Sequence, residues 1–168
     1  MEPDDPDEDE DDSINKTELE ELSYEYTQMA IHFIKALDNK YSLHSIRKVK
    51  EHDSFFKELR NNFDTINWYH AFIYVKLKRA IWSKDEMLQE DDEEMKEIIK
   101  SDIDGTAKVA VLSINRSVAA LNVLYNILPE FSKEISGLLV LLGNILNIAE
   151  LEFPDYQKFI RPGFDTIQ

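Results

Sequence analysis

The chain has 168 residues, a net charge of −15 at pH 7 and no cysteine. This length suits one domain that buries its core without cross-links, and the lack of cysteine excludes disulfides, thiolate catalysis and cysteine zinc sites. An acidic balance disfavours sequence-nonspecific nucleic-acid binding, which depends on a basic surface that neutralises phosphates. Because no apolar stretch follows Met1 and cysteine is missing, we expect a cytoplasmic protein that has no membrane partner.

The chain starts with an acidic stretch. Nine of the 34 acidic residues lie between Glu2 and Asp12, where there is no basic and no hydrophobic side chain. Without these nine, the net charge of −15 becomes −6. Like charges with nothing to bury stay solvated, so we expect residues 1–16 to be a disordered tail before a single domain at 17–168. An alternative role for this tail is to mask a basic surface of the same molecule.

The first predicted helix spans about 17–39. Thr17 and Glu20 form a capping box, in which the two side chains accept hydrogen bonds from free backbone amides. Apolar residues then recur at steps of three and four, the spacing of one face of an α-helix. These residues are Leu19, Leu22, Tyr26, Met29, Phe33 and Leu37. A basic connector follows at 40–53.

The second predicted helix runs from Ser54 to about Trp82 and has two apolar faces. A helix that is apolar on two sides needs cover on both. Cover for the second face is expected from residues 83–100, from the C-terminal tail, or from a second copy of the chain, and an aromatic small-molecule groove is a further alternative. The first face carries Phe56, Leu59, Phe63, Ile66, His70, Ile73, Leu77 and Ala80, and the second carries Trp68, Phe72, Val75, Arg79 and Trp82. The flanking Lys76, Lys78, Arg79 and Lys84 suit an acidic partner or the acidic tail.

Residues 83–104 admit two interpretations. Ser83 and Glu86 favour a short capped helix, with a break or a new helix start near Gly105, since glycine costs a helix interior about 1 kcal/mol relative to alanine. The uninterrupted apolar phase favours one long helix from about 92 to 127 instead. In both cases Leu128 and Pro129 end the helix, because the residue before a proline avoids helical geometry. Its expected inward face is Ala107, Ala110, Ile114, Ser117, Leu121 and Leu124.

A fourth helix is expected at about 131–152. It is apolar on most sides, so we expect it to lie centrally, and its longest apolar run, 137–149, is too short to span a bilayer. Strand signals are weak, and four helices of similar length predict an all-α fold, an antiparallel (up-and-down) four-helix bundle with a short C-terminal extension. The expected inward face of this helix is Phe131, Ile135, Leu138, Leu142, Ile145 and Ala149. In the extension, Arg161 to Phe164 suit a type II turn.

The histidines do not support metal chemistry. A di-iron bundle needs a glutamate three residues before a histidine, but His32, His44, His52 and His70 follow Met29, Tyr41, Val49 and Asn67 at that distance. No two histidines have the spacing of a His-Glu-x-x-His zinc site. We therefore expect no metal and no cofactor.

The leading interpretation is a non-enzymatic protein–protein interaction or self-associating module that uses Trp68, Phe72, Val75, Arg79 and Trp82. The alternative is a small-molecule or anion-binding pocket, with or without catalysis, lined by His70, Arg116, Asn67 and Asn144, since a buried arginine needs a carboxylate or a ligand anion. A second alternative comes from Arg47 and His52. Their spacing resembles the arginine–histidine motif of helical ribonucleases of the HEPN type, which implies that Arg47 orients phosphate and His52 acts as acid and base.

Overall fold

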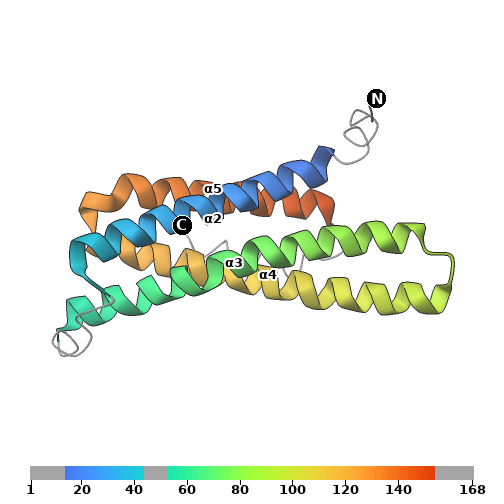
Figure 1. The fold of residues 1–168 in the computed structure, drawn as a ribbon, viewed down its shortest axis with the longest axis horizontal. Coiled ribbons are helices and arrows are strands. Elements are labelled where there is room, and N and C mark those ends of the chain that lie inside the picture. The colour runs from blue at the N-terminus through green and yellow to red at the C-terminus, as the bar shows by residue number, and fades with distance from the viewer. Residues whose placement is uncertain (1–13, 44–52, 154–168) are drawn as a thin grey trace, which may run out of the picture.

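The computed structural model describes residues 14–43 and 53–153. Within these ranges the chain forms four long helices, one 3₁₀ turn and no strand (Figure 1). They are α2 (Ile14–Tyr41), α3 (Ser54–Gln89), α4 (Glu93–Ile127), η1 (Pro129–Phe131) and α5 (Ser132–Glu152). Each long helix runs antiparallel to the one before it, and both α2 and α4 pack against α3 and α5. The predicted all-α four-helix bundle is therefore confirmed, while residues 1–13 and 154–168 of its predicted extensions lie outside the described residues.

The predicted inward positions build the core. On α2 the buried side chains include Leu19, Tyr26 and Phe33, and on α3 they include Phe63 and Ile73. Every predicted inward residue of α4 is buried, as are those of α5 from Ile135 to Ala149. Burial of a large apolar side chain stabilises the fold by about 1.5–3 kcal/mol, so these faces hold the four helices together.

The position of α5 differs from the expectation. It packs against α2 and α4 at a corner of the bundle, and its Val140 is 61% exposed. The predicted central position is therefore wrong. Four helices at the corners of a square leave no central place, and the exposed side of α5 also carries Lys133, Asn144 and Asn147.

The α3–α4 pair makes the most extensive contact in the bundle. Asp102 of α4 bonds to Arg79 of α3, and small buried residues continue along α4 on that side at steps of three and four. Small side chains allow the axes of two helices to approach closely. The residues of this small stripe are Thr106, Ala110, Ser113, Ser117 and Ala120.

Three predicted helix boundaries move. α2 begins at Ile14, three residues before the capping box at Thr17, so the helix includes the end of the expected tail. α3 continues past Trp82 to Gln89, and α4 starts at Glu93, where the Asp92 side chain accepts a hydrogen bond from the amide of Glu94. The long helix through Gly105 is confirmed and the break is wrong. Buried Ile103 and Ala107 on either side contribute more than the glycine costs.

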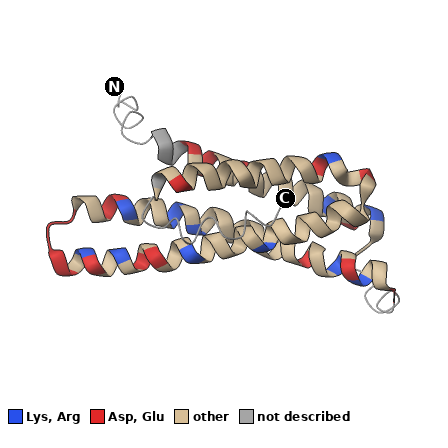
Figure 2. Cartoon of the chain, turned by 180° about the vertical axis from the view of Figure 1, so that it is seen from behind, with Lys and Arg blue, Asp and Glu red and all other residues tan. Residues whose placement is uncertain are grey.

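The α3–α4 hairpin extends beyond the start of α2 and the end of α5 (Figure 1). Its buried apolar positions end at Ile81 on α3 and at Ile99 on α4, and the partly buried Met87 packs against the core cluster. The apolar core therefore ends near Ile81 and Ile99. Beyond it lies a two-helix tip, and its turn carries a cluster of acidic residues (Figure 2).

Two helical stretches, Glu93–Ile127 and Pro129–Leu151, are long and apolar enough to cross a membrane. The thirteen-residue apolar run 137–149 understates the length of the second stretch, because the apolar window extends beyond this run. Inside the bundle, 56% and 44% of the two apolar windows are buried. Core helices of soluble proteins meet the same criterion of length and composition, so the finding is weak evidence for a membrane.

Candidate functional site

The second apolar face of α3 is exposed. Trp68, Val75 and Trp82 expose 65%, 53% and 60% of their surfaces, and Phe72 is also exposed between them. The stretch 83–100 does not cover this face, because it continues α3 and α4 as the hairpin tip. The residues of the predicted second face therefore lie together on one side of α3. The expectation that residues 83–100 cover this face is wrong.

Helix α4 widens this surface. Asp102 and Arg116 of α4 contact α3 at Arg79 and Tyr69, and residues at helical steps between them lie on the same edge of α4. Ile98, Val109 and Leu112 fall on this edge and are exposed. We call the combined surface the outer face. Its apolar members are Trp68, Phe72, Val75, Trp82, Ile98, Val109 and Leu112, and its central charged members are Arg79 and Asp102.

The α4 half of the outer face was not predicted from the sequence. The inward apolar phase of α4 is longer and more regular, so it dominates the sequence pattern. The signal was a second apolar phase at Ile98, Val109 and Leu112, whose spacings of eleven and three residues are sums of helical steps of three and four. This phase is interrupted by Asp102 and Gly105, so the sequence alone gives it little weight.

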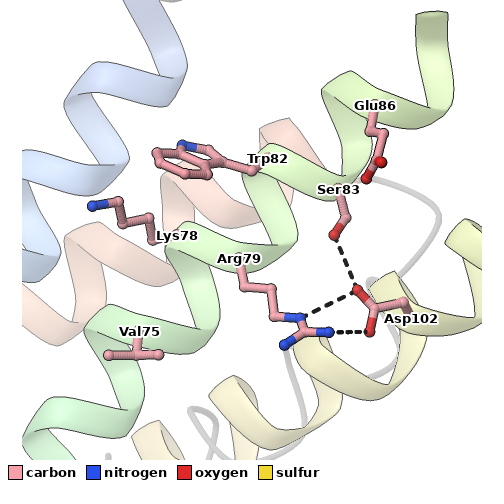
Figure 3. Close-up of a pocket in the computed structure, with 7 residues that line it drawn as sticks. All are labelled: Val75, Lys78, Arg79, Trp82, Ser83, Glu86 and Asp102. Atoms are coloured by element: carbon pink, nitrogen blue, oxygen red, sulfur yellow. Dashed lines mark hydrogen bonds and ion pairs between the residues drawn. The ribbon is translucent and has the colours of Figure 1, made fainter.

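An ion pair lies at the centre of the outer face (Figure 3). The Arg79 guanidinium donates from Nη2 to Oδ1 of Asp102 at 3.0 Å and from Nε to Oδ2 at 3.3 Å. The Ser83 hydroxyl donates to the same Oδ2 at 3.0 Å. The hydrogen bonds from Arg79 and then Ser83 lower the pKa of Asp102 below its usual range. Each charge already has its partner, so the pair presents little unsatisfied charge to anything that binds there.

Trp82 is held in place by two neighbours. Its indole Nε1 donates to Oε2 of Glu20 on α2 at 3.1 Å, and Lys78 Nζ lies 5.0 Å from the centre of its ring. Beside it is a hollow of about 470 Å³, open to solvent (Figure 3). Its walls are Val75, Lys78, Arg79, Trp82, Ser83, Glu86 and Asp102. The indole contributes to the wall of a surface hollow that opens along the outer face.

The basic residues that flank the outer face also have neighbours within the chain. Lys78 lies over the rings of Tyr74 and Trp82, and Lys84 lies 5.3 Å from the ring centre of Phe153. Arg79 is paired with Asp102. Because of these contacts, fewer basic side chains are available to bind an acidic partner than the sequence indicates. The acidic stretch 2–12, the other expected partner of these cations, lies outside the described residues.

The four residues of the predicted ligand pocket separate into different places. Asn67 and Arg116 line a second hollow of about 480 Å³, together with Asp64, Thr65, Trp68 and Tyr69. His70 is not among the lining residues, and Asn144 is exposed on α5. Arg116 is exposed rather than buried, and its Nη1 donates to the Tyr69 hydroxyl at 3.0 Å. Asp102 is fourteen residues away on the same helix, about 21 Å, and cannot reach Arg116.

His70 sits at the edge between α2 and α3. The Thr27 hydroxyl of α2 donates to its backbone carbonyl at 3.1 Å, whereas its ring Nδ1 is buried without a hydrogen-bond partner. Burial lowers the pKa of His70 below its usual value, so the neutral ring is favoured. These features fit a histidine that packs between two helices. Arg47 and His52, the residues of the ribonuclease alternative, lie outside the described residues.

A polar cluster joins the opposite end of the bundle. Glu130 of η1 accepts hydrogen bonds from Lys40 Nζ and the Tyr41 hydroxyl, both at 2.7 Å. These two bonds lower the pKa of Glu130 to about 2. The cluster ties the end of α2 to the α4–α5 turn and serves as a structural clamp.

Known proteins add no direct indication of function. Among residues 14–43 and 53–153, no group of three or more histidine, aspartate or glutamate side chains is arranged to hold a metal ion. No family model, no curated protein and no solved structure matches this chain. A function is therefore inferred from the outer face, which holds seven of the exposed large hydrophobic side chains of the described residues.

Proposed function

We propose that this chain is a non-enzymatic interaction module that binds protein through the outer face. The observation that carries this proposal is the exposed apolar area. The seven apolar side chains each expose between 36% and 65% of their surface. With roughly 150–250 Å² in a large side chain, they present roughly 700 Å². A typical monomer has a largest apolar patch of roughly 300–600 Å², and a stable interface buries about 800 Å² per partner.

The shape of the surface supports a protein partner over a small molecule. Two long antiparallel helices present rows of side chains, into which the rows of another helix can pack. Both hollows are open to solvent, whereas small-molecule sites enclose most of the ligand. Trp82 is held by Glu20 and Lys78, so little side-chain entropy is lost when it is covered.

A cytoplasmic location and the absence of membrane and nucleic-acid partners are part of the same proposal. The overall charge of −15 and the polar residues on the exposed side of α5 support them. The anion-pocket alternative keeps one supporting observation, the exposed Arg116 guanidinium beside a hollow. The exposed apolar area favours the interaction module.

Photo-crosslinking in cells tests the proposal. Val75 lies on the outer face and Val140 lies on α5, and both are valines exposed by more than half, so they form a matched pair. We expect a benzoylphenylalanine at position 75 to give protein adducts on illumination and one at position 140 to give few. Trp82→Ser should reduce the adducts at position 75. Equal yields at the two positions would overturn the proposal.

A further inference from the structure

Two charged side chains stand towards opposite ends of the outer face. Arg116 lines the hollow beside Trp68, and Glu86 lines the hollow beside Trp82. Both are exposed, and within residues 14–43 and 53–153 neither forms an ion pair. The outer face therefore has a positive charge without an ion pair at one end and a negative charge without an ion pair at the other, while Lys76 adds a further positive charge near Asp102. A surface that binds its own copy about a two-fold axis must be self-complementary, and opposite charges at its two ends meet this condition.

The spacing of these charges defines a symmetry axis. Arg116 bonds to Tyr69, and seventeen residues separate Tyr69 from Glu86, so the charges are about 25 Å apart along α3. A two-fold axis midway between them lies in the plane of the interface and passes over α3 between Val75 and Arg79. Rotation about this axis brings Arg116 next to Glu86 of the second copy. It also brings Phe72 across from Trp82 of the second copy, so aromatic side chains meet over the hollow shown in Figure 3.

Gly105 lies at the level of this axis. It follows Asp102 by one turn on α4, and Asp102 bonds to Arg79 and Ser83. Gly105 is exposed, and a Cβ atom added to it would meet nothing within 4 Å. Within the described parts of the chain nothing requires a glycine at this position, although the glycine costs the helix about 1 kcal/mol. A glycine at the axis allows the backbones of two copies to approach closely.

We propose that the chain forms a two-fold symmetric homodimer, in which the outer faces of two copies pack antiparallel with Arg116 of each beside Glu86 of the other. This inference rests on the proposed function and names its partner. The apolar side chains of two outer faces together present roughly 1,400 Å², within the roughly 1,200–2,000 Å² that specific interfaces bury. The central Arg79–Asp102 pair is already satisfied within each copy, which limits the cost of covering it.

Charge exchange tests the pairing. In sedimentation experiments on the purified full chain we expect a dimer that Arg116→Glu and Glu86→Arg each weaken, raising Kd by about tenfold or more, because like charges then face each other twice per dimer. The combined variant Arg116→Glu/Glu86→Arg should restore the dimer. Lys133→Glu, an exposed charge reversal on α5, is the control and should leave Kd unchanged. Failure of the combined variant to restore the dimer would overturn the proposed pairing.

A cysteine crosslink tests the symmetry. The natural chain has no cysteine, so Val75→Cys introduces a single thiol close to the proposed axis. A short bis-maleimide should link two copies through Val75→Cys and leave Val140→Cys uncoupled. If the purified chain is a monomer while position 75 still gives adducts with a different protein in cells, the homodimer is wrong and the interaction module stands. If the chain is a monomer and position 75 gives no adducts, both proposals fail, and cover by its own C-terminal residues becomes the explanation.

Discussion

Replacing Gly105 with alanine should stabilise the monomer. Gly105 lies inside α4 with a negative φ angle, and the added Cβ would meet no atom within 4 Å. The change therefore isolates helix propensity, which favours alanine by about 0.8–1 kcal/mol. In a chain of this size, such a gain raises Tm by about 2–4 °C.

Differential scanning calorimetry can measure this shift at a protein concentration where sedimentation shows a monomer, since a methyl group at the proposed axis would also act on the dimer. Ala119→Gly, at an exposed position of the same helix, is the mirror control and should lower Tm by a similar amount. The reasoning is refuted if Ala119→Gly lowers Tm while Gly105→Ala does not raise it. That outcome would mean that α4 is not a continuous, open helix at Gly105.

Three further predictions concern single side chains. Burial lowers the pKa of His70 below its usual 6.5, so the contribution of the neutral ring to stability is complete above pH 6.5 and declines below that pH. Tm should therefore fall more between pH 7.5 and 5.5 in the wild type than in His70→Asn. The pKa of Glu130 is about 2, so the contribution of its carboxylate to the stability of the fold is complete above pH 4.5 and is lost as the pH falls towards 2. The Tm difference between the wild type and Glu130→Gln should therefore shrink over that range. The buried Ser117 hydroxyl is close enough to lower the pKa of Tyr26 against the larger rise caused by burial, but neither hydroxyl reaches hydrogen-bond geometry. Tyr26→Phe should therefore change the free energy of unfolding in urea by less than about 0.5 kcal/mol, and a larger loss would show that the two hydroxyls are bonded.

The fold was predictable because burial follows the helical period. The steps of three and four from Leu19 to Leu37 and from Leu59 to Leu77 identify buried faces, and Pro129 marks a helix end. The break predicted at Gly105 was wrong, because a single residue that costs about 1 kcal/mol cannot break a helix with a buried isoleucine before it and a buried alanine after it. The apolar phase that runs through it was the better indicator.

The candidate site was predictable only in part. The helical period of the apolar residues places Trp68, Val75 and Trp82 on one side of α3. This period contains no information on the register between two helices. The pairing of Arg79 with Asp102 and of Arg116 with Tyr69 depends on that register. For the same reason the α4 half of the outer face could not be joined to the α3 half from the sequence alone.

The overhanging tip gives the molecule a graded resistance to opening. Ile114 and Leu121 are buried in the core of the bundle, so exposing a backbone amide there requires the whole bundle to come apart. Around the turn at residues 90–92, α3 and α4 extend beyond α2 and α5, so the turn can separate without disturbing those two helices. Amide hydrogens should therefore exchange with deuterium fastest near the acidic turn and more slowly towards the buried serines of α4, because opening starts at the tip.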